Sequence, residues 1–188
     1  MRYADDVVVH CISEKQSHYV LEGIKRRLHE CKLRLSEQKT KITYCQDYRR
    51  AARKDYPKSF NFLGHTFKPM AKKSNRTSGV FLGFDCELSM KARTRIIDEW
   101  RQMDFTREST LTLQDLAQKL NAKSRGIINY YSKMNVWAVG RLFRHLDYRI
   151  AKWVKNKFKS LRSYLRANDW LRGIKSTYPT MFVHWQLK

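Results

Sequence analysis

Acidic residues are scarce in this sequence relative to basic ones, and the imbalance restricts what the chain can bind. Only 17 aspartates and glutamates stand against 39 lysines and arginines, a formal net charge of +22 over 188 residues. An excess of this size favours a polyanionic partner. Aromatic residues, 13% of the chain, favour nucleic acid over a bare membrane surface. The alternative is that the charge only keeps the protein soluble.

Several other features are absent. The four cysteines (Cys11, Cys31, Cys45 and Cys86) show no Cys-x-x-Cys spacing, so we expect reduced thiols and no zinc site. No apolar run approaches the roughly 20 residues of a membrane helix, so no membrane association is expected. Met1-Arg2-Tyr3 leads directly into an expected strand, which leaves no room for a signal peptide. We therefore expect a cytoplasmic protein.

The first part of the chain is expected to combine short antiparallel strands with one helix. Residues 3–12 are typical of the second half of a hairpin. Ser13, with Gln16 three residues later, predicts the start of a helix with apolar residues at helical spacing. A turn at 36–40 precedes a predicted strand at 41–45. Aromatic-rich strands follow at 60–67 and 79–84, and the basic segments 46–58 and 68–76 are expected to be loops.

From Ser89 onward the pattern becomes helical. We expect helices at 90–103, 113–120, 122–131, 136–159 and 161–171, with Thr112 capping the second. The predicted fold class is α+β, with an all-α second domain. The predicted domains are residues 1–88 and 89–188.

Two adjacent carboxylates, Asp5 and Asp6, lie between a short apolar run and a run of three valines. A β-hairpin presents acids at its tip in this way. Carboxylates bind Mg²⁺, and two such ions about 4 Å apart can activate a primer hydroxyl and stabilise a leaving pyrophosphate. The alternative is a solvated acidic turn, but acids on a buried strand are costly without a metal.

The long helix predicted at 136–159 carries a basic stripe. Its members fall on one side of the helix at about 100° per residue: Arg141, Arg144, Tyr148, Lys152, Lys155 and Lys159. Its opposite side is apolar: Leu142, Phe143, Leu146, Ile150 and Trp153. Such a helix buries one face and offers a row of cations about 27 Å long to a phosphate backbone. A merely solvated face is the alternative.

Several motifs, in order along the chain, resemble those of group II intron reverse transcriptases. They are Tyr3-Ala4-Asp5-Asp6, Leu35-Ser36-Glu37-Gln38-Lys39-Thr40, Phe62-Leu63-Gly64, Leu120-Asn121 with Arg125-Gly126 and Asn129-Tyr130-Tyr131, and Phe182-Val183-His184-Trp185. The resemblance implies the latter half of a reverse-transcriptase palm followed by a helical thumb, the maturase-specific domain. It also implies an RNA-directed DNA polymerase that helps its intron RNA fold and splice.

The resemblance assigns expected roles to individual residues. Asp5, with Asp6 as a secondary ligand, would bind Mg²⁺ and act in catalysis. Tyr3 would lie near the incoming nucleotide or primer, or simply pack. Lys39 would approach the nucleotide phosphates, or be a solvated turn lysine. Gly64 would let the backbone approach a nucleic acid strand, or form a β-bulge.

In the thumb, Arg125 and the basic stripe would contact nucleic acid. The side chains of the Asn129-Tyr130-Tyr131 motif are expected to pack in the core of the thumb more than to contact a ligand. His184 and Trp185 are expected to dock the C-terminal segment onto the thumb. The expected partners are intron RNA and an RNA/DNA template–primer duplex.

The sequence lacks the family's fingers and early palm strands, including a third metal-binding aspartate. We therefore expect an N-terminally truncated fragment, inactive alone, with an upstream palm and fingers polypeptide as a possible partner. The alternative is a non-catalytic RNA-binding maturase module.

Overall fold

The computed structural model describes residues 1–74 and 78–187. They form two compact units, the first comprising Met1–Phe62 and Phe67–Asp85 and the second Leu63–Thr66 and Cys86–Lys188. The basic segment predicted to be a loop extends to Arg76, which lies outside the described residues. No helix in the described ranges is long and apolar enough to cross a membrane.

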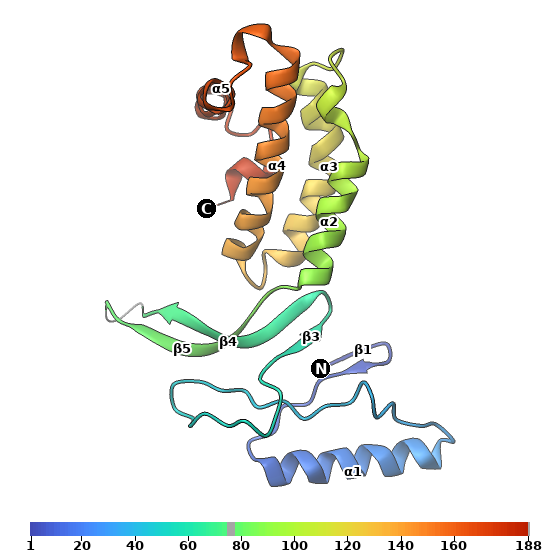
Figure 1. Ribbon diagram of the computed structural model, residues 1–188. Coiled ribbons are helices and arrows are strands. Elements are labelled where there is room, and N and C mark those ends of the chain that lie inside the picture. The colour runs from blue at the N-terminus through green and yellow to red at the C-terminus, as the bar shows by residue number, and fades with distance from the viewer. Residues whose placement is uncertain (75–77, 188) are drawn as a thin grey trace. The chain divides into compact units, whose positions relative to one another are not determined.

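The first unit contains a small hairpin, one helix and a long irregular segment (Figure 1). The hairpin consists of β1 (Arg2–Tyr3) and β2 (Asp6–Val7), paired antiparallel. Helix α1 (Glu14–Glu30) begins where the Ser13 hydroxyl accepts a hydrogen bond from the Gln16 backbone, so the predicted cap is confirmed. None of the α1 side chains is fully buried.

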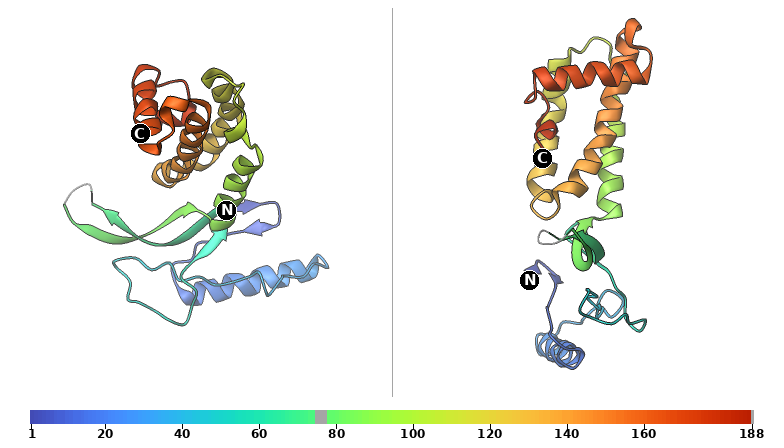
Figure 2. Two further views of the ribbon diagram at one scale, coloured as in Figure 1. Left: turned by 45° about the horizontal axis from the view of Figure 1, so that its top comes forward. Right: turned by 90° about the vertical axis from the view of Figure 1, so that its left-hand side faces the viewer.

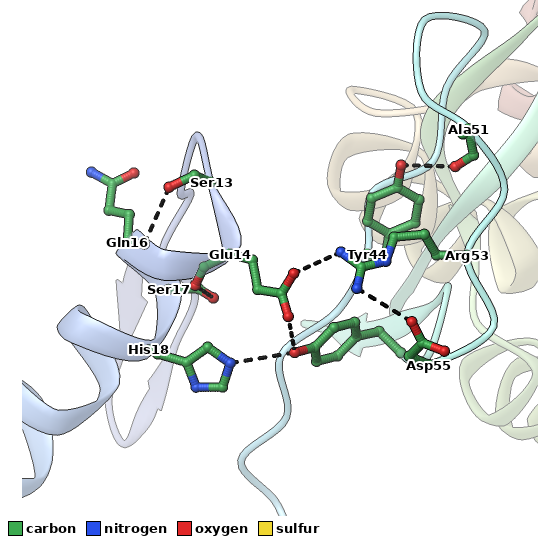
Figure 3. Close-up of polar contacts among 10 residues, drawn as sticks. Ser13, Glu14, Gln16, Ser17, His18, Tyr44, Ala51, Arg53 and Asp55 are labelled. Atoms are coloured by element: carbon green, nitrogen blue, oxygen red, sulfur yellow. Dashed lines mark hydrogen bonds and ion pairs between the residues drawn. The ribbon is translucent and has the colours of Figure 1, made fainter.

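Helix α1 is tied to the irregular segment by a polar cluster (Figure 3). The Glu14 carboxylate accepts hydrogen bonds from the Arg53 guanidinium and the Tyr56 hydroxyl, both at 2.6 Å. These two donors, Tyr56 first and Arg53 second, lower the pKa of Glu14. Figure 3 also shows His18 beside this cluster, where its ring lies 3.3 Å from the Tyr56 hydroxyl.

Residues 41–45 and 68–73 of the first unit differ from their predicted structure. Residues 41–45 do not form a strand, because among the described residues no neighbouring strand pairs with them; the Tyr44 amide instead donates to the Pro57 carbonyl. The basic residues from Lys68 to Lys73 are not a loop but the second half of a long strand. That strand lies between β3 and β5 in the order of its sheet, and it has nine residues whereas β3 has only three.

This three-stranded sheet has the order β3-β4-β5. Its strands are β3 (Phe60–Phe62), β4 (His65–Lys73) and β5 (Val80–Leu88). The strand predicted at 60–67 is therefore divided by a turn at Leu63–Gly64 into β3 and the start of β4, whereas the predicted pairing with the second aromatic-rich segment holds for β4 and β5. Phe60 stacks on Phe67 across β3 and β4, with ring centroids 4.9 Å apart.

The second unit is helical. It contains α2 (Met90–Gln102), η1 (Phe105–Arg107), α3 (Leu113–Tyr131), α4 (Val136–Lys157), η2 (Lys159–Leu161), α5 (Tyr164–Thr177) and η3 (Val183–Gln186). Helices α2, α3 and α4 lie side by side, and α5 runs across them (Figures 1 and 2). The fold class is α+β, as predicted.

Two helix predictions need correction. Helix α3 is continuous where two helices were expected, because the Asn121 side chain bonds to a distant segment instead of competing for its own backbone. Helix α5 begins at Tyr164, after a separate short turn, and continues past Gly173 to Thr177. The Thr112 cap is confirmed and forms a reciprocal capping box with Asp115.

The core of the second unit is large and apolar. One face of α4 supplies much of it, including all five apolar residues predicted for that face. The largest fully buried side chains of the unit are Trp100, Trp153, Phe105, Phe182, Leu116, Leu120, Leu142, Leu146 and Ile150. This burial fixes which side of α4 faces outward, and that outward side is the basic one.

Candidate nucleic-acid interface

The acidic hairpin places Asp5 and Asp6 differently. Tyr3 pairs with Asp6, which leaves Ala4 and Asp5 as a two-residue turn. Ala4 has φ of 50°, the positive value that a type II′ turn has at its first central position. An acid-tipped hairpin is present, but it is complete within Arg2–Val7, so the strand expected as far as residue 12 is absent and Asp5 lies in the turn.

Side chains alternate along a strand, so Tyr3 would share a face with Asp5 if both lay in one strand. Because Tyr3 and Asp6 are directly opposed across the two strands, their side chains share a face instead. All three side chains are exposed.

A complete divalent-metal site is not formed by these residues. Mg²⁺ requires six oxygen ligands in near-ideal octahedral geometry, usually one or two carboxylates with waters and substrate oxygens. Within the part of the chain that the structure describes, no group of three His, Cys, Asp or Glu side chains is placed to hold a metal ion. Asp5 and Asp6 thus offer two carboxylates to a metal ion, with no third acidic ligand beside them among the described residues.

Lys39 lies in the tight turn predicted between α1 and the irregular segment. The Ser36 carbonyl accepts from the Lys39 amide at 3.2 Å and from the Thr40 amide at 2.9 Å. The Lys39 side chain is exposed. The turn therefore presents an ammonium group to solvent, which leaves the phosphate-binding role and the solvated-lysine reading both open.

Gly64 is required by backbone conformation and packing. It follows Leu63 in the two-residue turn between β3 and β4, where φ is 48° at Leu63 and 75° at Gly64. Positive values at both positions are typical of a type I′ hairpin turn, so this is a turn and not a β-bulge. A Cβ atom on Gly64 would lie 2.9 Å from the Tyr131 hydroxyl oxygen.

The Asn129-Tyr130-Tyr131 motif holds this turn. Tyr131 is buried and packs against His65, with ring centroids 5.2 Å apart. The Tyr130 hydroxyl donates to the Leu63 carbonyl at 3.1 Å. Burial lowers the pKa of His65. Tyr131 thus has the core role expected of it, whereas Asn129 and Tyr130 are exposed.

Helix α4 presents the basic face predicted from the sequence. Arg141, Arg144, Tyr148 and Lys152 are exposed along it. Lys159, however, lies beyond the helix in η2, because the backbone turns extended at Phe158. Arg125, on α3, is also exposed.

Two members of the face have partners within the second unit. Arg141 forms an ion pair with Glu87 at 3.4 Å. The Lys155 ammonium lies 4.5 Å from the centre of the Tyr164 ring, which stacks on Tyr148 with centroids 5.1 Å apart. The hydrogen bond to Tyr148 raises the pKa of Tyr164. Arg144 and Lys152 have no ion-pair partner among residues 1–74 and 78–187.

Sequence reasoning missed two aromatic residues on this side of the second unit. Tyr164 could not be placed because its contact with Tyr148 joins two helices. Trp137 could have been found, since it lies four residues before Arg141 and seven before Arg144. Its side chain is 81% exposed.

The C-terminal segment is fastened by side chains of α3 and α4. Asn121 donates to the Met181 carbonyl at 2.8 Å and accepts from the Val183 amide at 3.0 Å. The Asp147 carboxylate contacts the His184 Nε2 at 2.8 Å and accepts from the Trp185 indole at 3.0 Å. The predicted docking of the C-terminus is confirmed.

Comparison with known protein families agrees with both units. Residues 1–67 match the family described as reverse transcriptase (RNA-dependent DNA polymerase). Residues 93–170 match the group II intron, maturase-specific domain. Searches of curated proteins and of solved structures found no significant match. The two family matches cover most of the chain, in the order that the motifs predicted, and the chain therefore belongs to the group II intron reverse transcriptases and maturases.

Proposed function

We propose that the second unit binds group II intron RNA and RNA/DNA template–primer duplex through the exposed face of α4. The observation that carries this proposal is the unshared positive charge of Arg144 and Lys152 on a helix whose opposite face is fully buried. Tyr148 lies between them on the same face, and Arg141, Lys155, Lys159 and Arg125 add further charge. A phosphate backbone complements such a row of cations.

The salt dependence of binding tests this proposal. Each phosphate contact contributes about 0.9 to the slope of log affinity against log salt for duplex DNA and about 0.7 for single strands. Replacing Arg144 and Lys152 with glutamine should therefore reduce the slope for RNA by roughly one and a half units. The fold should persist, because neither side chain is buried.

A matched control removes two charges elsewhere. Lys15 and Arg26 of α1 are both exposed, and replacing them with glutamine changes the net charge equally. The control should leave the slope nearly unchanged. Equal effects of the two double variants would mean that the net charge alone, and not the α4 face, attracts RNA.

A second candidate function, RNA-directed DNA polymerisation, is favoured by the match of the first unit to reverse transcriptases. In this proposal Asp5 and Asp6 are the catalytic carboxylates and bind Mg²⁺, with another ligand supplied from outside the described residues. Tyr3 and Lys39 lie near the nucleotide, and the Gly64 turn lies near the primer. Mg²⁺ would supply charge stabilisation to the transferred phosphoryl group.

Primer extension separates the polymerase from a maturase module without catalysis. We expect no extension by this chain alone, since two carboxylates from one hairpin do not anchor the pair of Mg²⁺ ions that such phosphoryl transfer uses. Extension should appear when a polypeptide carrying the family's earlier palm and fingers is added. Asp5→Asn should then abolish it, whereas Glu37→Gln, which removes an exposed carboxylate from another turn, should not. If no such polypeptide restores extension but RNA still binds, the non-catalytic maturase is the correct function.

A further inference from the structure

An exposed tryptophan lies at the start of the basic face. Trp137 is the second residue of α4 and is 81% exposed, whereas Trp100, Trp153 and Trp185 are at most 8% exposed. Residues at i, i+4 and i+7 lie on one face of a helix, so Trp137 shares a face with Arg141 and Arg144. The ring gains nothing from burial in the folded chain, and its exposed face beside two guanidinium groups is available to a ligand.

The indole borders a shallow hollow of about 270 Å³ in the second unit. The hollow is lined by Val136, Trp137, Gly140, Arg141, Arg144 and Leu187. Among the described residues, its lining includes two guanidinium groups and no carboxylate. The Arg141 guanidinium forms an ion pair with the Glu87 carboxylate, so the Arg144 guanidinium is the one available to a phosphate.

Gly140 keeps this hollow open. A glycine inside a helix destabilises it by about 1 kcal/mol relative to alanine. Neither packing nor backbone conformation requires glycine here, because a Cβ atom would meet nothing within 4 Å and φ is not positive. The missing side chain instead leaves space beside the Trp137 ring.

We propose that this hollow holds one unpaired nucleobase of bound RNA, stacked on the indole of Trp137, with its phosphate against Arg144. The proposal rests on the RNA binding proposed above and adds a subsite for a single-stranded or flipped-out nucleotide. Stacking on an aromatic ring accepts any base, because every base has a π face. A protein partner is less well matched, since the apolar lining of Val136, Trp137 and Leu187 is bordered by guanidinium groups whose charge suits a phosphate.

Four variants of the full chain test the subsite. Trp137→Ala removes the platform, and Trp137→Phe retains an aromatic ring. Gly140→Leu fills the hollow without changing charge, and Gly140→Ala is its control, because a methyl group meets open space. Affinity is measured for a single-stranded RNA of about ten nucleotides and for a blunt RNA duplex. Quenching of tryptophan fluorescence by the single strand is measured in parallel.

We expect Trp137→Ala to weaken single-strand binding by about 5- to 100-fold, the effect of removing a stacking aromatic. Gly140→Leu should weaken it comparably, whereas Trp137→Phe and Gly140→Ala should stay within a few-fold of the unchanged chain. Duplex affinity and the salt slope should not change. The quenching should disappear with Trp137→Phe, because the exposed indole is its source.

Two other outcomes overturn the subsite. Single-strand affinity unchanged by both Trp137→Ala and Gly140→Leu would mean that another ligand, such as a protein, covers the indole. Equal losses on single strand and duplex would mean that the variants disturb α4 generally. If the unchanged chain binds neither RNA, the proposed function itself fails, and this result is distinct from both.

Discussion

Replacing Gly64 with alanine should destabilise the second unit. Two costs follow from the structure. A residue with a Cβ atom at φ of 75° pays about 1–2 kcal/mol for the left-handed conformation. The new methyl group would also lie 2.9 Å from the Tyr131 hydroxyl, and such overpacking costs about 1–3 kcal/mol.

The expected total is about 2–5 kcal/mol, a large share of the roughly 5–15 kcal/mol by which a domain is stable. Thermal or urea denaturation of the full chain should show it, with a melting temperature lower by about 10 °C or more. Gly126→Ala is the matched control. Gly126 lies inside α3 with nothing within 4 Å of an added Cβ atom, so this change should stabilise the protein by up to about 1 kcal/mol.

A double-mutant cycle separates the two costs. Tyr131→Phe removes the hydroxyl, after which the nearest remaining ring atom is 3.3 Å from the added Cβ atom. In that background Gly64→Ala should cost only the conformational part, about 1–2 kcal/mol. An equal cost in both backgrounds would refute the steric argument. If Gly64→Ala leaves the free energy of unfolding unchanged or raises it, as is expected of Gly126→Ala, the turn assignment itself is refuted.

Three further outcomes are expected. Asn121→Ala should lower the free energy of unfolding by about 1–3 kcal/mol, because it leaves two backbone groups of the C-terminal segment without partners. Amide hydrogen exchange at 181–187 should then accelerate, and unchanged protection of these amides would contradict this role of Asn121. Thr112→Ala should cost about 1 kcal/mol through loss of the capping box, whereas Thr112→Ser should be nearly neutral by urea denaturation. Burial lowers the pKa values of His65 and His145, so below about pH 6.5 the unfolded chain binds more protons than the folded chain. The urea concentration at the unfolding midpoint should therefore fall as the pH drops through that value. A constant midpoint between pH 7.5 and 5.5 would contradict this expectation.

Local chemistry made much of the architecture predictable. The hydroxyls of Ser13 and Thr112 cap the helices expected of them, since a cap depends only on residues within one turn. The spacing of apolar residues likewise identified the buried face of α4 and, by exclusion, its basic face. The ordered motifs were enough to indicate the family, which the two family matches then supported.

Other features depended on contacts between residues far apart in the sequence. Segment 41–45 has the composition of a strand, but a strand exists only where another backbone pairs with it. Asn121 was expected to separate two helices and instead joins a continuous helix to the C-terminal segment. Neither outcome can be derived from the neighbouring residues alone.

The sequence by itself determined where most helices begin, their caps, the buried face of α4 and the positive charge of this protein, because each follows from residue type and short-range spacing. Only the tertiary structure decided how the candidate site is built. It set Asp5 in a turn, placed the Gly64 backbone against Tyr131, and left Trp137 exposed beside an open hollow. The physical reason is that exposure and close approach are properties of packed neighbours, which the order of residues along the chain does not specify.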